Sequence, residues 1–412
     1  MIEPMDKNKL KEFIKAIPKC DLHVHLDGSL RIGTIIDLAK KAGVKLPSYT
    51  EEGMCEKVFK ETYKDLVDYL QGFGYSIGVM QSPENIERIA FEFAEDNIKE
   101  GVYYVEVRFA PQFHINKLMG VEEVIEAVTK GMDRAKKQYN SSKLVKEGKT
   151  PRFEYAIIGC AMRSIPRGVS EFFDKFVEVH KYSSFTRVNA LASYELVLAM
   201  IKARDAGLPI TGFDLAGAEA GFPASEHREA YALAHRNFFK KTVHAGEAYG
   251  AESIFQAITE LYADRIGHGY YLFSEDMIKN KNITDKKEFI NRLVQYIADR
   301  RITIEVCLTS NMQTNPSIVK LQDHSFRKML DNKLSLCLCT DNRTVSKTTV
   351  SRELELAVEH FDLSYRQLKN STIYGLKRSF YPGSYKEKRD YVRNIIDFYQ
   401  AAEAQHLSLI HI

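Results

Sequence analysis

A regular alternation of short apolar runs with amphipathic stretches limits the fold of this chain more than any other feature. Eight runs are rich in β-branched and aromatic residues, and they cover 20–27, 102–110, 153–162, 208–217, 240–247, 265–270, 302–311 and 334–342. The stretches between them have helical spacing, as in 122–139, 193–206, 225–239, 253–262, 286–299 and 317–332. Eight strand–helix alternations predict an α/β fold, a (β/α)8 TIM barrel.

The spacing of the runs predicts how the rest of the chain is arranged. A length of 412 residues suits one large barrel or two to three ordinary domains, and the alternation favours a single domain over 1–412. Residues 28–101 separate the first two runs, which is more chain than one crossover helix needs. We therefore expect extra helices after the first strand, with lid helices within about 35–95. We also expect a helical tail after 342.

Composition excludes several classes of partner. The 58 basic and 55 acidic residues give a net charge of +3, so nothing favours nucleic acid or an anionic membrane. The apolar runs are too short to cross a bilayer, and residues 1–19 lack the features of a signal peptide. The six cysteines form no Cys-x-x-Cys pair and are expected to be free thiols. We expect a soluble, cytoplasmic protein that binds a small molecule; its oligomeric state stays open.

Polar residues end most of the predicted strands. In a (β/α)8 barrel the C-terminal strand ends carry the chemistry. His23 and His25 lie one residue apart on the first strand and therefore point the same way. The other polar residues and glycines at strand ends are Asp27, Asp214, Gly217, His244, Glu247, His268, Thr309, Ser310, Asn311, Asp341 and Asn342. Histidines elsewhere, His324 among them, are interpreted as ordinary hydrogen-bonded residues.

Four of these side chains have the chemistry of a metal site. Three imidazoles and one carboxylate, from His23, His25, His244 and Asp341, suit one Zn²⁺ with an open position for water. Such a metal lowers the pKa of bound water to about 7. His268 could orient or deprotonate that nucleophile, and Glu247 could donate a proton to the substrate from the opposite side.

Five motifs occur in an order found in one known family. They are His-x-His at 23–25, Gly-Phe-Asp-Leu-Ala-Gly at 212–217, His-Ala-Gly-Glu at 244–247, Arg-Ile-Gly-His-Gly at 265–269 and Cys-Thr-Asp-Asn at 339–342. Together they resemble the adenosine deaminase family of the metal-dependent amidohydrolases, in its bacterial form. The resemblance extends over nearly the whole chain.

The resemblance implies hydrolytic deamination of adenosine and 2′-deoxyadenosine to inosine and 2′-deoxyinosine in purine salvage. It implies one zinc on the four residues above, Glu247 as the proton donor to purine N1, and His268 as the residue that positions or deprotonates the zinc-bound water. Asp27 would contact a ribose hydroxyl and the Gly217 backbone N–H would contact purine N3. Four lid residues would close over the sugar, namely Leu66, Tyr69, Leu70 and Phe73.

One position departs from the animal members of that family. They carry an aspartate that contacts purine N7 where this chain has Asn342. An amide donates to N7 directly, whereas an aspartate must first take up a proton. We expect Asn342 to be a variant shared with bacterial members.

Other functions remain open at this point. A related deaminase could act on adenine, on a 5′-modified adenosine or on aminodeoxyfutalosine. A two-metal amidohydrolase usually has a bridging lysine at the end of its fourth strand, and the run ending at Gly217 has none. A non-catalytic, deaminase-like binding protein is a third possibility, although such proteins lose ligands and none is lost here. The Pro-Cys-x-x-Cys pattern of cytidine-type deaminases is absent.

Overall fold

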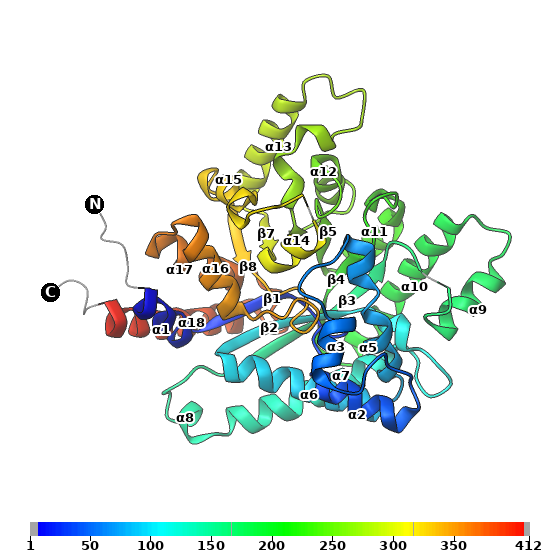
Figure 1. Ribbon diagram of the computed structural model, residues 1–412, viewed down its shortest axis with the longest axis horizontal. Coiled ribbons are helices and arrows are strands. Elements are labelled where there is room, and N and C mark those ends of the chain that lie inside the picture. The colour runs from blue at the N-terminus through cyan, green and yellow to red at the C-terminus, as the bar shows by residue number, and fades with distance from the viewer. Residues whose placement is uncertain (1–6, 166, 316, 408–412) are drawn as a thin grey trace.

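The computed structural model describes residues 7–165, 167–315 and 317–407, and eight parallel strands form its centre (Figure 1). The strands are β1 Lys19–His25, β2 Val102–Phe109, β3 Glu154–Met162, β4 Ile210–Ala216, β5 Lys240–Ala245, β6 Arg265–His268, β7 Thr303–Val306 and β8 Ser335–Leu338. Each strand pairs with the next in sequence order. All seven residues of β1 are buried, as expected for a parallel strand covered on both faces.

Helices separate the strands and surround them (Figure 1). The α-helices are α1 Lys7–Ala16, α2 Ile32–Ala42, α3 Glu51–Lys57, α4 Leu66–Leu70, α5 Phe73–Val79, α6 Pro83–Glu100, α7 Val121–Asn140, α8 Lys143–Lys146, α9 Glu171–Val179, α10 Phe185–Asp205, α11 Arg228–Arg236, α12 Ala251–Thr259, α13 Lys286–Arg300, α14 Leu308–Thr314, α15 Phe326–Asp331, α16 Val350–Phe361, α17 Tyr365–Lys377 and α18 Tyr385–Leu407. Short 3₁₀ helices are η1 Pro111–His114, η2 Ala224–His227, η3 Tyr270–Phe273, η4 Glu275–Met277 and η5 Leu321–Asp323.

The segment after β8 returns to β1 and nearly closes the barrel. The backbone N–H of His25 donates to the carbonyl of Asp341 at 2.7 Å, and the N–H of Asp341 donates to the carbonyl of His23 at 2.8 Å. Val24 and Asp341 form an isolated parallel bridge. The predicted (β/α)8 barrel is confirmed, and its closure brings Asp341 beside the two histidines of β1.

The prediction was wrong at the end of the seventh run. Strand β7 stops at Val306, and helix α14 begins at Leu308, where a strand to 311 was expected. Cys307 and Leu308 are apolar and both buried, so their pattern does not distinguish a strand from the first turn of a buried helix. As a result Ser310 and Asn311 lie on a helical turn, with their side chains directed at the strand ends on either side.

The long insertion after β1 contains α2 to α6. Helix α6 packs along α7 and β2 outside the barrel, and short helices α4 and α5 supply residues to the central cavity. Local signals define α6: Ser82 caps its N-terminus by accepting the Asn85 N–H, and Gly101, at φ 84°, ends it. The expected extra helices between the first and second strands are thus present.

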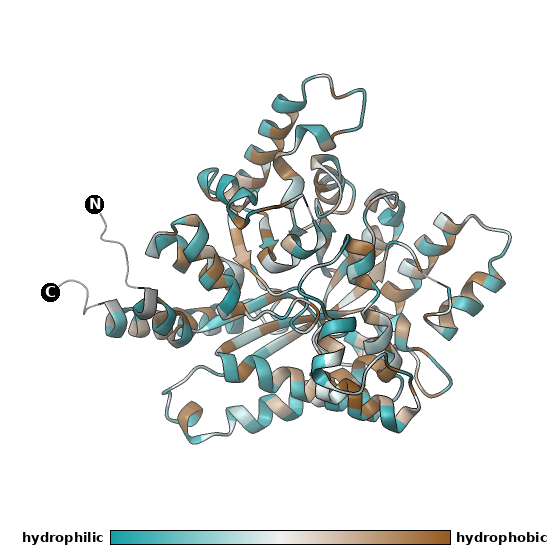
Figure 2. Cartoon of the chain, viewed as in Figure 1, coloured by the Kyte–Doolittle hydropathy of each residue, from teal (hydrophilic) through white to brown (hydrophobic). Residues whose placement is uncertain are grey.

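The C-terminal tail is helical, as expected. Helix α17 packs on β8 and β1, and α18 packs on α1, so the two ends of the described chain lie together (Figure 1). Along the outer helices, hydrophilic and hydrophobic residues alternate, which is typical of helices with one face on a core (Figure 2).

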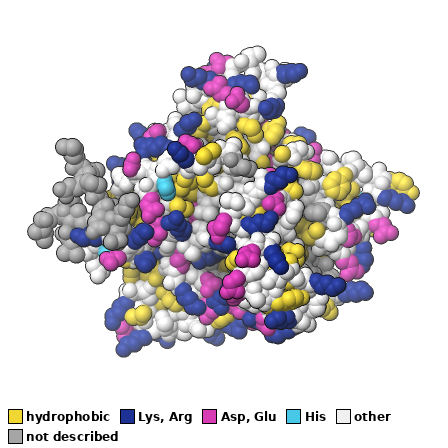
Figure 3. Space-filling view, in the orientation of Figure 1, with side chains coloured by type: hydrophobic (Ala, Val, Ile, Leu, Met, Phe, Trp, Pro, Cys, Tyr) yellow, Lys and Arg dark blue, Asp and Glu magenta, His cyan; other side chains and the backbone are white. Residues whose placement is uncertain are grey.

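The surface shows no separation of charge on the face seen in Figure 3, where Lys and Arg are interspersed with Asp and Glu. Within the described ranges, no helix is both long enough and apolar enough to span a membrane.

Candidate active site

Three histidine rings and one carboxylate meet at the C-terminal ends of β1, β5 and β8. The Nε2 atoms of His23 and His25 each lie 3.1 Å from Nε2 of His244. The same two Nε2 atoms each lie 3.5 Å from Oδ1 of Asp341. The four residues are buried. The structure therefore brings together every residue that the sequence analysis predicted as a metal ligand.

The outer nitrogens of two of these rings face carboxylates. His23 Nδ1 lies 2.7 Å from Glu305 Oε2, and His244 Nδ1 lies 3.0 Å from Asp214 Oδ2. A carboxylate only accepts, so each neutral ring has its proton on Nδ1 and a bare lone pair on Nε2. Bare nitrogens 3.1 Å apart cannot bond each other, and a cation between them would satisfy both. The donor set thus fits a metal of the Zn²⁺ class.

His268 adjoins this group from the end of β6. Within the described part of the chain, His23, His244, His268 and Asp341 offer ligand atoms that all lie within 4.8 Å of one another. His25 reaches the same point through its contact with His244. Geometry alone therefore leaves five side chains around one position, more than a tetrahedral site accepts.

Buried arginines form ion pairs with the two carboxylates that face the histidines of the cluster. Arg108 donates to Asp214 at 2.8 Å and to Glu305 at 3.0 Å, and Arg265 donates to Glu305 at 2.6 Å. Burial alone would raise the pKa of Glu305, but the two guanidinium groups and His23 hold it well below its usual range. Glu305 and Asp214 therefore stay ionised and keep the two imidazoles oriented.

Two of the polar residues at strand ends have a backbone conformation that is rare outside glycine. The φ angle is 64° at His268 and 61° at Asp341, in the left-handed region. This conformation costs about 1–2 kcal/mol for a residue with a Cβ. Such strain persists where the surrounding structure fixes it, and here it aims both side chains into the cluster.

Glu247 lines the cavity beside the cluster, with its Oε2 3.6 Å from Nε2 of His268. Burial raises the pKa of its carboxyl well above the usual range, and the negative charges of Asp341 and Glu219 add to that shift. This shift favours the protonated form of the carboxyl, which is the form that can act as a general acid.

Glu219 holds the loop that carries Glu247. Its carboxylate accepts the backbone N–H groups of residues 246, 247, 248 and 249, at 2.7 to 3.0 Å, and the hydroxyl of Ser253. Its side chain lies 4.0 Å from Arg163. The sequence does not indicate this role, because a carboxylate that binds mainly backbone N–H groups leaves no signature in the residue types around it.

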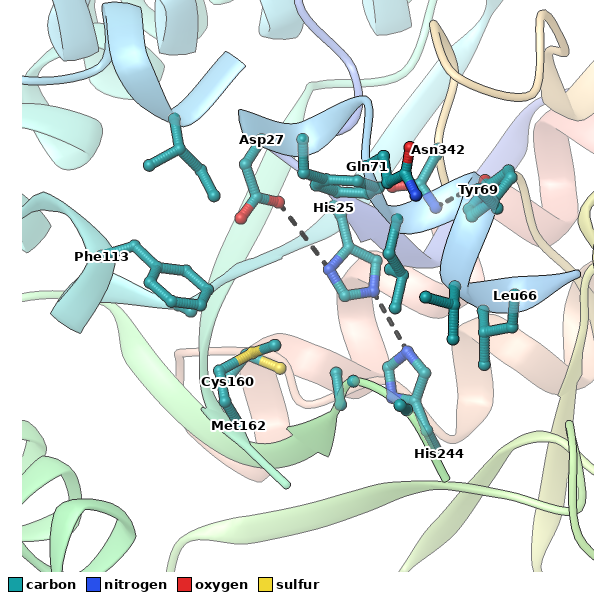
Figure 4. Close-up of a pocket in the computed structure, with 18 of the residues that line it drawn as sticks. His25, Asp27, Leu66, Tyr69, Gln71, Phe113, Cys160, Met162, His244 and Asn342 are labelled. Carbon is teal, nitrogen blue, oxygen red and sulfur yellow. Dashed lines mark hydrogen bonds and ion pairs between the residues drawn. The ribbon is translucent and has the colours of Figure 1, made fainter. Parts of the chain in front are cut away.

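A cavity of about 470 Å³ opens above the cluster (Figure 4). Its wall contains all the predicted substrate-contacting residues, namely Asp27, Leu66, Tyr69, Leu70, Phe73, Gly217 and Asn342, together with Glu247 and His268. Phe113, Cys160 and Met162 line it as well and were not predicted. Burial raises the pKa of Asp27 to about 7.

Asn342 lies at the cavity edge, with its amide held by the lid. Its Nδ2 donates to the hydroxyl of Tyr69 at 2.8 Å (Figure 4), and that hydroxyl contacts Ser346 at 2.7 Å. One of the two amide hydrogens is thus engaged within the protein, and the other is left for a ligand.

Comparison with known proteins shows which family has this sequence pattern. The profile of the adenosine deaminase family matches residues 18–397. An adenosine deaminase of Mycobacterium avium (strain 104) is 33% identical over 373 residues, which cover 90% of this chain and 92% of that protein.

The chain belongs to the adenosine deaminase family.

Two solved structures of similar fold extend this view of the deaminase. The Arabidopsis N6-mAMP deaminase MAPDA is 25% identical with a TM-score of 0.69, and the match covers 94% of this chain and 99% of that chain. A Burkholderia ambifaria amidohydrolase with bound Zn is 19% identical with a TM-score of 0.74, and the match covers 99% and 97%. Membership of this family identifies the chain as a hydrolytic deaminase. The proteins that it matches are named after more than one purine substrate.

Several residues of this deaminase site had no predicted role. Asn311 was recognised as polar at a strand end, and His324 was interpreted as an ordinary histidine. In the structure both are buried and bonded to each other behind His268. Ser310 donates to Asp341 at 2.6 Å. Ser310 and Asn311 carried a signal, as polar residues in an apolar run, whereas His324 lies in a helical stretch; the partners of all three are set only by the fold.

Proposed function

We propose that this deaminase converts adenosine and 2′-deoxyadenosine to inosine and 2′-deoxyinosine with release of ammonia. The observation that carries the proposal is the shared cavity. A His/Asp cluster, a carboxyl with a raised pKa and the Asp27 carboxyl line one space of about 470 Å³. That volume falls in the range of small-molecule sites and suits a nucleoside.

Different residues of this chain have separate roles in the proposed reaction. Glu247 holds a proton and delivers it to purine N1, which makes C6 electrophilic. The Gly217 N–H and the Asn342 amide would bind N3 and N7 of the base, and Asp27 would bind a ribose hydroxyl. The lid residues Leu66, Tyr69, Leu70 and Phe73 cover the sugar and exclude water.

One zinc on His23, His25, His244 and Asp341 is part of the proposal. The bare Nε2 atoms of His23 and His244 and the converging Asp341 oxygen support it. When bound, such a metal supplies hydroxide at neutral pH. His268 faces the same space and orients the nucleophile.

An uncharged nucleoside fits the wall better than a nucleotide. No Lys or Arg occurs among the described residues that line the cavity, whereas its aromatic and aliphatic side chains include Phe73, Ile77 and Phe113. A phosphate placed there would lose its hydration without gaining a charged partner. We therefore expect AMP to be a poor substrate.

A cytoplasmic location is also proposed. All six cysteines are free thiols, and five of them are buried. Disulfides form in secreted proteins, whereas thiols stay reduced in the cytosol.

The proposal is tested by kcat/KM for adenosine, 2′-deoxyadenosine, adenine, AMP, methylthioadenosine and aminodeoxyfutalosine, measured on the zinc-loaded protein. We expect adenosine and 2′-deoxyadenosine to have the highest values and AMP the lowest. The Glu247→Gln variant is the matched control, since it should bind metal and turn over none of them. A value for adenine or a 5′-modified compound about tenfold above that for adenosine would assign a different substrate.

A further inference from the structure

We propose that Asn311 and His324 are positioning residues that hold His268 in the tautomer with its proton on Nε2. His268 then faces the reacting atoms as a hydrogen-bond donor and is unable to act there as a base or as a metal ligand. The inference concerns the same site as the proposed deamination, and its catalytic part rests on that function.

One group in this hydrogen-bond network can only donate. The backbone N–H of Phe326 donates to Nδ1 of His324 at 3.0 Å. A backbone N–H cannot accept, so this Nδ1 has a free lone pair. Burial lowers the pKa of His324 to about 3, which keeps the ring neutral. The single proton of His324 is therefore on Nε2.

That proton sets the orientation of the next side chain. His324 Nε2 lies 3.2 Å from Asn311, and a nitrogen that carries a proton requires the amide oxygen opposite it. The amide nitrogen of Asn311 must then face the other way. It lies 3.1 Å from Nδ1 of His268. Oxygen and nitrogen of an amide are otherwise hard to tell apart, and here the bonding of His324 decides.

The amide nitrogen in turn sets the tautomer of His268. An amide N–H only donates, so Nδ1 of His268 accepts and cannot hold a proton. The proton of the neutral ring is on Nε2, which is buried, has no partner among the described residues and points toward Glu247 at 3.6 Å.

The two ligand histidines with carboxylate partners have the opposite arrangement. Glu305 and Asp214 accept the Nδ1 protons of His23 and His244, which leaves their Nε2 lone pairs facing the cluster. The Asn311 amide behind His268 produces the reverse arrangement, with the lone pair on Nδ1 and the proton on Nε2. The partners behind His23, His244 and His268 thus separate two of the proposed metal ligands from the histidine that contacts the nucleophile, although all three rings surround one point.

The role of His268 in the reaction follows from the tautomer. Its Nε2–H can donate to the oxygen of the nucleophile and to the charge that develops there as C6 becomes tetrahedral. Accepting a proton is then left to carboxylates that face the same space, Asp341 and, after it has protonated N1, Glu247.

The tautomer is measured directly by ¹⁵N NMR of the zinc-loaded protein with ¹⁵N-labelled histidine, with His268→Asn used for assignment. We expect His268 to show a pyrrole-type Nε2 and a pyridine-type Nδ1. A protonated Nδ1 would overturn the proposal. This readout needs no substrate, so a protein that fails to deaminate adenosine would refute the proposed function and leave the tautomer measurable.

Asn311→Asp tests the cause. Its carboxylate would accept from both rings, moving the His268 proton to Nδ1 at nearly unchanged shape. We expect the ¹⁵N pattern to invert and kcat to fall by about 100-fold, with a smaller change in KM and normal metal content. Gln322→Glu is the matched control, because it makes the same amide-to-acid change at an exposed residue that contacts Nδ1 of the partly buried His360. An Asn311→Asp protein with unchanged kcat and tautomer would contradict the proposal.

Variants of His324 separate orientation from packing. Gln can present an N–H to Asn311 where the ring did, so His324→Gln should retain most of the activity and the His268 pattern. His324→Leu removes the donor and lets the Asn311 amide rotate, which should lower kcat and mix the two tautomers. Equal effects of both variants would show that His324 only fills space.

Discussion

The Oε2 atom of Glu219 accepts the backbone N–H of Glu247 at 2.9 Å, and the same carboxylate binds the three other N–H groups of that loop. The proposed proton donor, Glu247, is thus positioned through its own main chain. Glu219 also adds negative charge near the Glu247 carboxyl, which favours its protonated form.

Replacing Glu219 with Gln should lower kcat by about 100-fold, because a side-chain amide would oppose backbone N–H groups and let the Glu247 loop shift. Metal content should stay normal, because none of the hydrogen bonds described for Glu219 involves a residue of the His/Asp cluster. Steady-state kinetics and metal analysis check both points. Ser253→Ala removes a single contact to Glu219 and should have a much smaller effect; if the two variants behaved alike, the loop would not depend on the carboxylate.

The pH dependence should report the proton on Glu247. Since the acid must be protonated to act, kcat/KM should be level at neutral pH and fall about tenfold per pH unit once the pH exceeds the raised pKa of Glu247. Removing the Glu219 charge lowers that pKa, so the alkaline decline of Glu219→Gln should begin at lower pH. A kcat/KM that instead climbs to an alkaline plateau would show that an ionised group is the one required.

The Asp214–His244 contact predicts an effect on metal affinity. Asp214→Asn keeps the shape but weakens the acceptor for His244 Nδ1–H, so zinc affinity should fall by about 10–100-fold. Competition with a chelator measures this. The control is Asp264→Asn. Asp264 is exposed and pairs with Lys241, which lies on the same strand as His244, so this change should leave the zinc affinity unchanged. An Asp214→Asn protein that binds zinc as tightly as the natural one would exclude this role.

Periodicity and strand-end chemistry were enough to predict the barrel and the four-residue cluster, and the family resemblance added part of the cavity wall. They fell short where a partner comes from a distant part of the chain. Glu219 acts through four backbone groups, and His324 acts through Asn311, so neither has a role that its neighbours in sequence indicate. The early end of β7 had a different cause: the local pattern at Cys307 and Leu308 does not distinguish a buried strand from a buried helical turn.

Metal titration of the stripped protein, with inosine formation from adenosine as the readout, tests the central claim most directly. We predict that activity is absent without metal, rises linearly with added Zn²⁺ and saturates at one ion per chain, while Glu247→Gln binds the same single ion and forms no inosine. Activity that needs two ions per chain, persists without metal or yields no inosine from adenosine would contradict the account.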